Sequence, residues 1–302
     1  MRRALVTGAT SYPGQRLLAR LMAEGIEVHA LVRMTSDLAR FDPLPHLPVI
    51  HPHDGSYAMM HDIMAETRPD IVFHLASHYV REHKPEQIDG LIESNLTFGL
   101  YLLEAMRQTG VPRLVNVGTF AQFYESPEYR PLSLYAATKQ AFEDLLAYYV
   151  DLGLSATTLI FFDTYGPYDW RPRLVNALLD AWVNNTQLPL PESHVKVTLD
   201  LVYIDDAIEA LWQAGRRLMT DPKPLSGRRF AIGSGDRHTL RQVVELFEQV
   251  SGREIIKAWG MWPLPDRHVI TPWEGPNLPG WRPTVGLAEG LKRCLEARGH
   301  AG

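Results

Sequence analysis

The 302-residue sequence has a single cysteine, Cys294, and no long apolar run. One cysteine cannot form an internal disulfide, and such cysteine usage is typical of proteins in a reducing compartment. No segment reaches the roughly 20 apolar residues that a membrane-spanning helix needs. Thr7 and Gly8 interrupt the early apolar run that a secretory signal requires. We therefore expect a cytoplasmic protein with no membrane partner.

An excess of positive charge is also missing. The chain has 30 Lys and Arg against 35 Asp and Glu, a formal net charge of −5, so the balance does not favour nucleic acid as a partner. Histidines gather between residues 46 and 83, but no carboxylate or cysteine joins them at ligand spacing, and no metal site is expected. The hydrophobic content of 45% is that of an ordinary globular chain, with one large or two closely packed domains.

The first half of the chain alternates strand and helix patterns. Short apolar runs rich in β-branched residues predict strands at Ala4–Thr7, Val28–Val32, Val49–His51, Ile71–Leu75, Leu114–Val117 and Thr157–Phe162. Segments with helical spacing separate most of them. This alternation predicts βαβ units, and hence an α/β fold with a Rossmann-type, doubly wound parallel sheet. Ligands of such sheets bind beyond the carboxyl ends of the strands.

After about residue 165 the pattern changes. Prolines and tryptophans crowd into long loops between expected helices at Leu174–Val183, Asp205–Leu218, Leu240–Val250 and Leu287–Leu295. We expect residues 1–165 to form a dinucleotide-binding domain and residues 166–302 to form mainly a smaller, substrate-binding lid domain. Within a segment near 197–235, Val197–Tyr203 and Arg229–Ile232 are expected to return to the central sheet as strands.

A glycine-rich turn follows the first expected strand. Gly8-x-x-Ser11-x-x-Gly14 lies between that strand and a helix, where a dinucleotide-binding loop belongs. Gly8 would form the tight turn, and Gly14 would let the helix pack closely on the strand. Ser11 stands where a glycine usually approaches the pyrophosphate, and its hydroxyl can donate to phosphate. Taken alone, the two glycines also fit a plain strand–turn–helix.

A second motif, Tyr135 with Lys139, indicates which function the glycine-rich turn has. Tyr135 and Lys139 lie four residues apart on an evident helix and therefore share a face. Tyr-x-x-x-Lys after T-G-x-x-x-x-x-G resembles the short-chain dehydrogenase/reductases. The length, "FHLAS" after the fourth strand and "FFDTYGP" after the sixth resemble their extended branch, which acts largely on nucleotide sugars.

The resemblance implies a catalytic triad. Tyr135 would exchange a proton with the substrate, while the Lys139 ammonium lowers the phenol's pKa and holds the nicotinamide ribose. The third member is a Ser or Thr at the end of the fifth strand. We assign it to Thr119, although an alignment without gaps on Tyr124 puts the position at Phe120. A threonine that only packs at the strand end is the alternative.

The expected cofactor is NADPH. The second strand ends without the acidic residue that would bind a ribose 2′-hydroxyl: Val32 stands there, and Arg33, which suits a 2′-phosphate, follows. A surface arginine is the alternative. The expected cofactor-binding residues are Gly8, Thr10, Ser11, Tyr12, Gly14, Arg33, Asp54, Gly55, Leu75, Ala76, Ser77, Tyr135, Lys139, Phe162 and Thr164.

Two sister reactions fit less well. The 4,6-dehydratases of the family carry an Asp-Glu pair after the catalytic threonine, where this chain has Phe120, Ala121 and Gln122. The 4-epimerases keep NAD bound, which Arg33 disfavours, but epimerisation stays open as the alternative. The stretch "NVGTFAQFYESPEYRPLSLYAATKQAFEDLLAYY" looks most like the CDP-abequose and CDP-paratose synthase group. That resemblance implies NADPH-dependent reduction of the 4-keto group of a nucleotide-linked deoxyhexose, CDP-linked or, second, dTDP-linked. A non-catalytic dinucleotide-binding sensor or scaffold is the alternative from another class.

The remaining expectations concern partners. Arginine forks match diphosphate oxygens, and Arg267 has the place of a pyrophosphate-binding arginine in the extended family. The expected substrate-binding residues are His78, Ala121, Gln122, Arg171, Arg173 and Arg267. Family resemblance also implies a homodimer through the helix of Tyr135 and the preceding helix around Leu91–Met106, both apolar on more than one face.

Overall fold

The computed structural model describes residues 1–191 and 196–299. It contains two compact units. The first consists of Met1–Gln122, Ser133–Ile160 and Ile208–Phe230, and the second of Phe123–Leu132, Phe161–Ala207 and Ala231–Gly302. The chain therefore passes between the units several times, where the sequence suggested one main boundary near residue 165.

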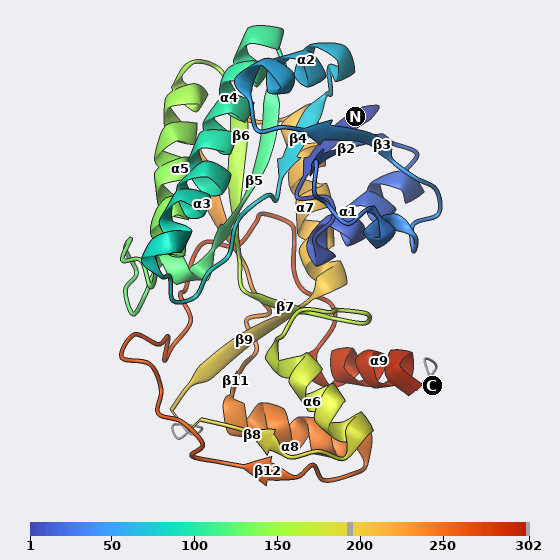
Figure 1. The fold of residues 1–302 in the computed structure, drawn as a ribbon, viewed down its shortest axis with the longest axis vertical. Coiled ribbons are helices and arrows are strands. Elements are labelled where there is room, and N and C mark those ends of the chain that lie inside the picture. The colour runs from blue at the N-terminus through green and yellow to red at the C-terminus, as the bar shows by residue number, and fades with distance from the viewer. Residues whose placement is uncertain (192–195, 300–302) are drawn as a thin grey trace. The chain divides into compact units, whose positions relative to one another are not determined.

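A seven-stranded parallel sheet forms the centre of the first unit, in the order β10-β6-β5-β4-β1-β2-β3 (Figure 1). The strands are β1 (Arg3–Thr7), β2 (Glu27–Arg33), β3 (Val49–His53), β4 (Ile71–His74), β5 (Arg113–Thr119), β6 (Ser155–Phe161) and β10 (Arg228–Ile232). The strand order reverses between β1 and β4. Loops after these two strands diverge at such a switch point and leave room for a ligand. The predicted fold class is confirmed.

Two layers of helices cover this sheet (Figure 1). On one face α2 (Tyr57–Thr67), α4 (Phe98–Thr109) and α5 (Leu134–Asp151) pack side by side. The other face carries α1 (Tyr12–Ala23) and α7 (Ile204–Thr220). Because both faces are covered, the strands consist of nearly continuous apolar runs. Leu5 on β1 and Val72 on β4 are fully buried.

Shorter helical segments complete the first unit. These are η1 (Leu38–Phe41), η2 (Pro85–Gln87), α3 (Ile88–Ile92), the π-helical turn η3 (Glu93–Thr97) and η4 (Phe120–Gln122). The segments α3, η3 and α4 follow one another without a break. The π-helical turn matters because such turns are frequent at functional sites.

The second unit has its own small sheets and apolar core. β7 (Asp163–Tyr165), β9 (Thr198–Tyr203) and β11 (Arg237–Thr239) form one sheet, and β8 (Leu188–Pro189) pairs with β12 (Lys257–Ala258). Helices α6 (Leu174–Asn184), α8 (Leu240–Ser251) and α9 (Leu287–Gly299) enclose a core that includes Phe247 and Leu291. Within the described residues of both units, no helix is long and apolar enough to cross a membrane.

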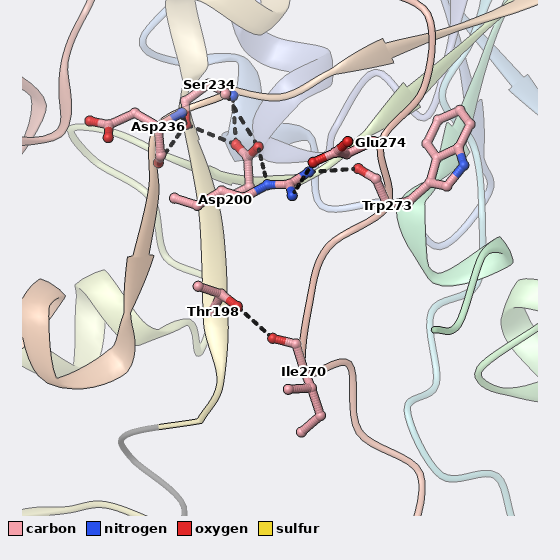
Figure 2. Close-up of polar contacts among 9 residues, drawn as sticks. Thr198, Asp200, Ser234, Asp236, Ile270, Trp273 and Glu274 are labelled. Carbon is pink, nitrogen blue, oxygen red and sulfur yellow. Dashed lines mark hydrogen bonds and ion pairs between the residues drawn. The ribbon is translucent and has the colours of Figure 1, made fainter. Parts of the chain in front are cut away.

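One predicted strand position is wrong. β10 joins the central sheet, as expected for Arg229–Ile232, but Val197–Tyr203 supplies β9 of the separate three-stranded sheet. Asp200 on β9 is buried, and it accepts hydrogen bonds from Ser234 N at 2.6 Å and Ser234 Oγ at 2.8 Å (Figure 2). Thr198 Oγ1 donates to Ile270 O at 2.6 Å. A buried carboxylate needs such donors, which a central parallel strand between apolar neighbours does not offer.

Candidate active site

The turn after β1 is a close-packed loop that only glycine permits at two positions. Gly8 has φ +67°, and a Cβ there would lie 2.6 Å from Ala76 N and 2.7 Å from Leu75 C, at the end of β4. A Cβ on Gly14 would lie 2.3 Å from Gly8 O. These clashes involve backbone atoms, which cannot move aside as a flexible side chain can. The two glycines therefore bring the first turn of α1 and the loop after β4 into contact with the end of β1, as a dinucleotide loop requires.

Ser11 replaces a glycine because it caps the helix. It precedes α1 with φ −73° and ψ 161°, and its Oγ accepts a hydrogen bond from Gly14 N at 3.1 Å. Pro13 lies in the first turn, where its missing N–H costs nothing. The hydroxyl hydrogen of Ser11 remains able to donate to an anion at this helix N-terminus. Thr10 and Tyr12 flank the cap, and the Tyr12 side chain is buried.

The ends of β2 and β3 carry the residues expected near the adenosine. Arg33 is exposed and pairs in register with His53. Across residues 1–191 and 196–299, no side chain forms a hydrogen bond or ion pair with its guanidinium. Asp54 is also exposed, and hydrogen bonding from Ser56 lowers the pKa of its carboxyl. Gly55, beside it, has φ +89°.

Helix α5 presents the Tyr135 and Lys139 pair. The helix begins at a Ser133 cap, whose Oγ accepts from Ala136 N at 3.3 Å. Tyr135 is partly exposed, but Lys139 is only 3% exposed. Burial lowers the pKa of Lys139 from 10.5 to about 8, and the negative charge of Glu143 opposes this shift.

The Lys139 ammonium has no hydrogen-bonding or ion-pair partner in the part of the chain that the structure describes. A buried ammonium without such partners costs free energy. A ligand that brings hydroxyl acceptors, such as a ribose, would satisfy it. The close-packed glycine loop and this buried donor both fit a nicotinamide dinucleotide.

Two side chains that the sequence analysis missed flank this pair. The ring of Tyr79 lies edge-on to that of Tyr135, with centroids 5.0 Å apart and an interplanar angle of 80°. Asn95, buried in η3, accepts from His78 N at 2.7 Å and donates to Thr138 Oγ1 at 2.9 Å. Asn95 thus ties the loop after β4 to α5. A polar amide inside an apolar helical pattern was the available signal.

The end of β5 holds the expected third catalytic residue. Thr119 Oγ1 accepts from Ala121 N at 3.3 Å, and its hydrogen remains free to donate. Thr119 N donates to the side chain of Gln122 at 2.9 Å. Gln122 is fully buried and donates to Gln140 and Glu143 at 3.0 and 2.6 Å. All its polar positions are used inside the first unit, so a role in the fold suits Gln122 better than the expected substrate contact.

In the second unit, Arg171 forms a clamp within its own loop. It donates to both carboxylate oxygens of buried Asp169, at 2.8 and 2.7 Å, and to Thr164 O at 2.9 Å. Thr164, on β7, and Phe162, just before it, are buried. The guanidinium of Arg171 is therefore occupied by the fold, and the expected phosphate contact does not suit its geometry.

The two other expected arginines also have protein partners. Arg173 precedes α6 and lies 3.4 Å from the Asp163 carboxylate. Arg267 is exposed and donates through Nε to Leu132 O at 3.1 Å and through Nη2 to Pro131 O at 2.6 Å. Its guanidinium lies 4.7 Å from the centre of the Tyr124 ring. Among the residues that the structure describes, Nη1 of Arg267 has no hydrogen-bond partner and could donate to an anion.

The histidines form contacts of their own. His29 Nδ1 lies 2.8 Å from His51 Nε2 in a stacked pair, and His29 Nε2 lies 3.0 Å from Glu27 Oε1. Burial lowers the pKa of both imidazoles. Among the residues that the structure covers, no group of three or more His, Cys, Asp or Glu is arranged to hold a metal ion.

Comparisons with known proteins identify the family of this chain. The sequence model of the NAD dependent epimerase/dehydratase family matches residues 4–233. CDP-abequose synthase of Yersinia pseudotuberculosis is 25% identical over 84% of this chain and 86% of the relative. UDP-glucose 4-epimerase of Mycolicibacterium smegmatis is 26% identical over 97% of each chain. The crystal structure of the Thermus thermophilus UDP-glucose 4-epimerase in complex with NAD has a TM-score of 0.81 and 27% identity, covering 99% of this chain and 100% of that one.

The family expected from the glycine loop and the Tyr135 and Lys139 pair is confirmed. The family match spans the central sheet from β1 to β10, and the structural match extends over both units. The chain therefore belongs to the NAD dependent epimerase/dehydratase family, within the extended short-chain dehydrogenase/reductases.

Proposed function

We propose that this protein is an NADPH-dependent reductase of the 4-keto group of a nucleotide-linked deoxyhexose. The observation that carries the proposal is the pair on α5: a partly exposed phenol, Tyr135, one helical turn before the buried Lys139 ammonium. Such a pair suits proton transfer coupled to hydride transfer. A non-catalytic sensor or scaffold would need neither side chain.

Each member of the site has a distinct task in this reaction. Bound nicotinamide would supply the hydride to C4 of the keto sugar. Tyr135 donates its phenolic proton to the oxygen that becomes the hydroxyl, and the positive charge of Lys139 stabilises the phenolate left behind. Thr119 donates a hydrogen bond to the carbonyl oxygen. Lys139 also holds the ribose hydroxyls.

Arg33 supports NADPH over NADH. The residue before it is Val32, and the guanidinium lies exposed at the carboxyl end of β2 without a partner in the described structure. An arginine fork fits a 2′-phosphate, whereas a carboxylate there would repel it. We expect Arg33→Ala to lose affinity for NADPH but not for NADH. Equal affinity of the unmodified protein for both cofactors would contradict this preference.

A 4-epimerase is the second candidate, because several relatives carry that name, including the Mycolicibacterium smegmatis protein. Epimerases of this kind return the hydride to the same sugar and need no net reductant. Two features favour net reduction: Arg33 and the similarity to CDP-abequose synthase over 84% of this chain. The same similarity favours CDP over dTDP as the nucleotide of the substrate.

The diphosphate would be met by arginines of the second unit. With Arg171 engaged by Asp169, Arg267 and Arg173 are the better candidates, and Nη1 of Arg267 is open to an anion. Removing a hydrogen bond to a charged group costs about 1.5–3 kcal/mol. Arg267→Ala is therefore expected to raise the Michaelis constant for the sugar nucleotide about tenfold or more, with NADPH affinity unchanged.

A homodimer is also proposed. Apolar side chains recur at helical spacing along α3, α4 and α5 and at the residue that follows α5, and they stay exposed: Ile88, Ile92, Leu100, Tyr148 and Leu152. Exposed stripes on neighbouring helices mark protein interfaces. Light scattering at micromolar concentration is expected to give twice the 34.2 kDa chain mass. A monomeric mass would reject the dimer.

The direct test of the reaction is turnover with CDP-, dTDP-, UDP- and GDP-linked 4-keto sugars, followed by NADPH absorbance and by NMR of the product. A reductase consumes NADPH in proportion to product. An epimerase interconverts 4-hydroxy sugars without consuming it. A scaffold does neither.

A further inference from the structure

A buried polar chain runs from the end of β5 into α5, behind the proposed catalytic pair. Thr119 N donates to Gln122 Oε1 at 2.9 Å, and Gln122 Nε2 donates to Glu143 Oε1 at 2.6 Å. Gly118 leaves room for it, because a Cβ there would lie 2.9 Å from Gln122 Oε1. The carboxylate of Glu143 thus connects through one side chain to the backbone of Thr119.

Glu143 also lies on the same face of α5 as the catalytic pair. It follows Lys139 by four residues and Tyr135 by eight, so the three side chains succeed one another along the helix. Lys139 is 3% exposed and Glu143 is 8% exposed. In such surroundings opposite charges one helical turn apart interact more strongly than they do in water.

Arg229, Asp144 and His74 are charged or titratable groups that interact with Glu143 or Lys139. Arg229 Nε on β10 lies 3.4 Å from Glu143 Oε2. Asp144 is next to Glu143 on α5 and accepts from Gln140 Nε2 at 2.8 Å. Burial holds the pKa of the His74 imidazole, on β4, well below its usual range, and the charge of Lys139 lowers it further. The negative charge of Glu143 raises the pKa of Lys139 and so opposes the effect of burial.

A buried carboxylate is expensive for the fold, since an apolar side chain of similar size packs there at lower cost. Burial raises the pKa of Glu143, against the attraction of Arg229, the hydrogen bond from Gln122 and the charge of Lys139. A purely structural ion pair with Arg229 would explain the contact at 3.4 Å. It would not explain why the same carboxylate accepts from Gln122, which binds the backbone of Thr119, and lies one turn from Lys139.

We propose that Glu143 is a positioning residue of the reductase site, which anchors the Thr119 end of β5 through Gln122 and places a negative charge one helical turn beyond Lys139. This inference rests on the proposed function for the roles of Thr119 and Lys139. In this proposal Glu143 acts only through Gln122 and Lys139, and it contacts neither the substrate nor the cofactor.

The test is the pH dependence of cofactor binding, followed by NADPH fluorescence, in the wild-type protein and in Glu143→Gln. Glutamine keeps an oxygen that accepts from Gln122 but removes the charge. Affinity is expected to fall as pH rises through the titration of Lys139, and in Glu143→Gln this fall is expected about one pH unit lower. Glu248→Gln is the matched control. Its carboxylate is also partly buried, and it is bound to Lys257 and Ile255 N in the second unit. This control is expected to follow the wild-type profile.

A Glu143→Gln profile that coincides with the wild-type profile overturns the proposal. If that variant does not fold, Glu143→Asp decides the matter. It keeps the charge but retreats from Gln122, so it is expected to retain the wild-type pH profile with a kcat at least fivefold lower. A Glu143→Asp protein with wild-type kcat overturns the proposal. If no 4-keto sugar is turned over, the cofactor-binding profile still tests Glu143, so failure of the reductase function and failure of this inference give different results.

Discussion

Alanine at position 14 puts a methyl group where the glycine loop has no space. The added Cβ would lie 2.3 Å from Gly8 O and 2.8 Å from Ala9 O, whereas an ordinary contact is at least 3.4 Å. To remove this clash, α1 and the turn after β1 must separate by about 1 Å. Overpacking of this kind costs about 1–3 kcal/mol, while alanine in a helix regains up to about 1 kcal/mol over glycine.

Gly90→Ala is the matched control, because Gly90 is helical and a Cβ there meets no atom within 4 Å beyond its chain neighbours and its own helix backbone. We expect Gly14→Ala to lower the free energy of unfolding by about 1–2 kcal/mol in urea titrations, and Gly90→Ala to raise it by up to about 1 kcal/mol. The displaced loop should also weaken NADPH binding at least tenfold in Gly14→Ala alone. If both variants had the same stability and wild-type cofactor affinity, the account of the loop would be refuted.

Three further predictions follow from the same site. Tyr135→Phe should reduce kcat by about 10²–10⁴-fold with NADPH affinity nearly unchanged, because it removes only the proton donor; a wild-type rate would refute the mechanism. Ser11→Gly should lose a few tenths of a kcal/mol of stability and keep cofactor affinity within about tenfold, because glycine is also a tolerated N-cap; complete loss of binding would reveal a further role for the serine. Lys139→Met should abolish turnover yet stabilise the protein without cofactor by up to about 3 kcal/mol at pH 7. The pKa of Lys139 is lowered from 10.5 to about 8 in the fold, so the unfolded chain binds the proton more tightly. The free-energy cost of burying the Lys139 ammonium is full below about pH 8 and disappears by about pH 10.5. Urea titrations across this range should show the free energies of unfolding of the wild type and Lys139→Met converging.

The sequence was enough to locate the main elements of the central sheet. β-branched apolar runs and helical spacing report burial on two faces, and burial is what the parallel sheet imposes on each strand. The segment of β9 was wrongly placed in the central sheet. Its Thr198 and Asp200 alternate with leucines, and such alternation is typical of a sheet with one polar side. Its hydrogen-bond donor, Ser234, is far away along the chain.

The contacts between side chains were the other part of the site that the sequence did not predict. The two glycines, Tyr135 and Lys139 follow from motif spacing alone, because each acts through its own position on a loop or a helix face. The clamp of Arg171 on Asp169 and the enclosure of Gln122 by Gln140 and Glu143 depend on which side chains the fold brings together. Those contacts carry no periodic signal. For the same reason Asn95, which bridges two segments, was missed.

The most direct test of the proposed function is NADPH oxidation with a CDP-linked 4-keto-6-deoxyhexose, measured together with the NMR spectrum of the product. The account predicts one NADPH consumed for each 4-hydroxy sugar formed, a kcat lower by about 10²–10⁴-fold in Tyr135→Phe, and a slower reaction with NADH. Interconversion of 4-hydroxy sugars without consumption of NADPH would contradict it and identify an epimerase.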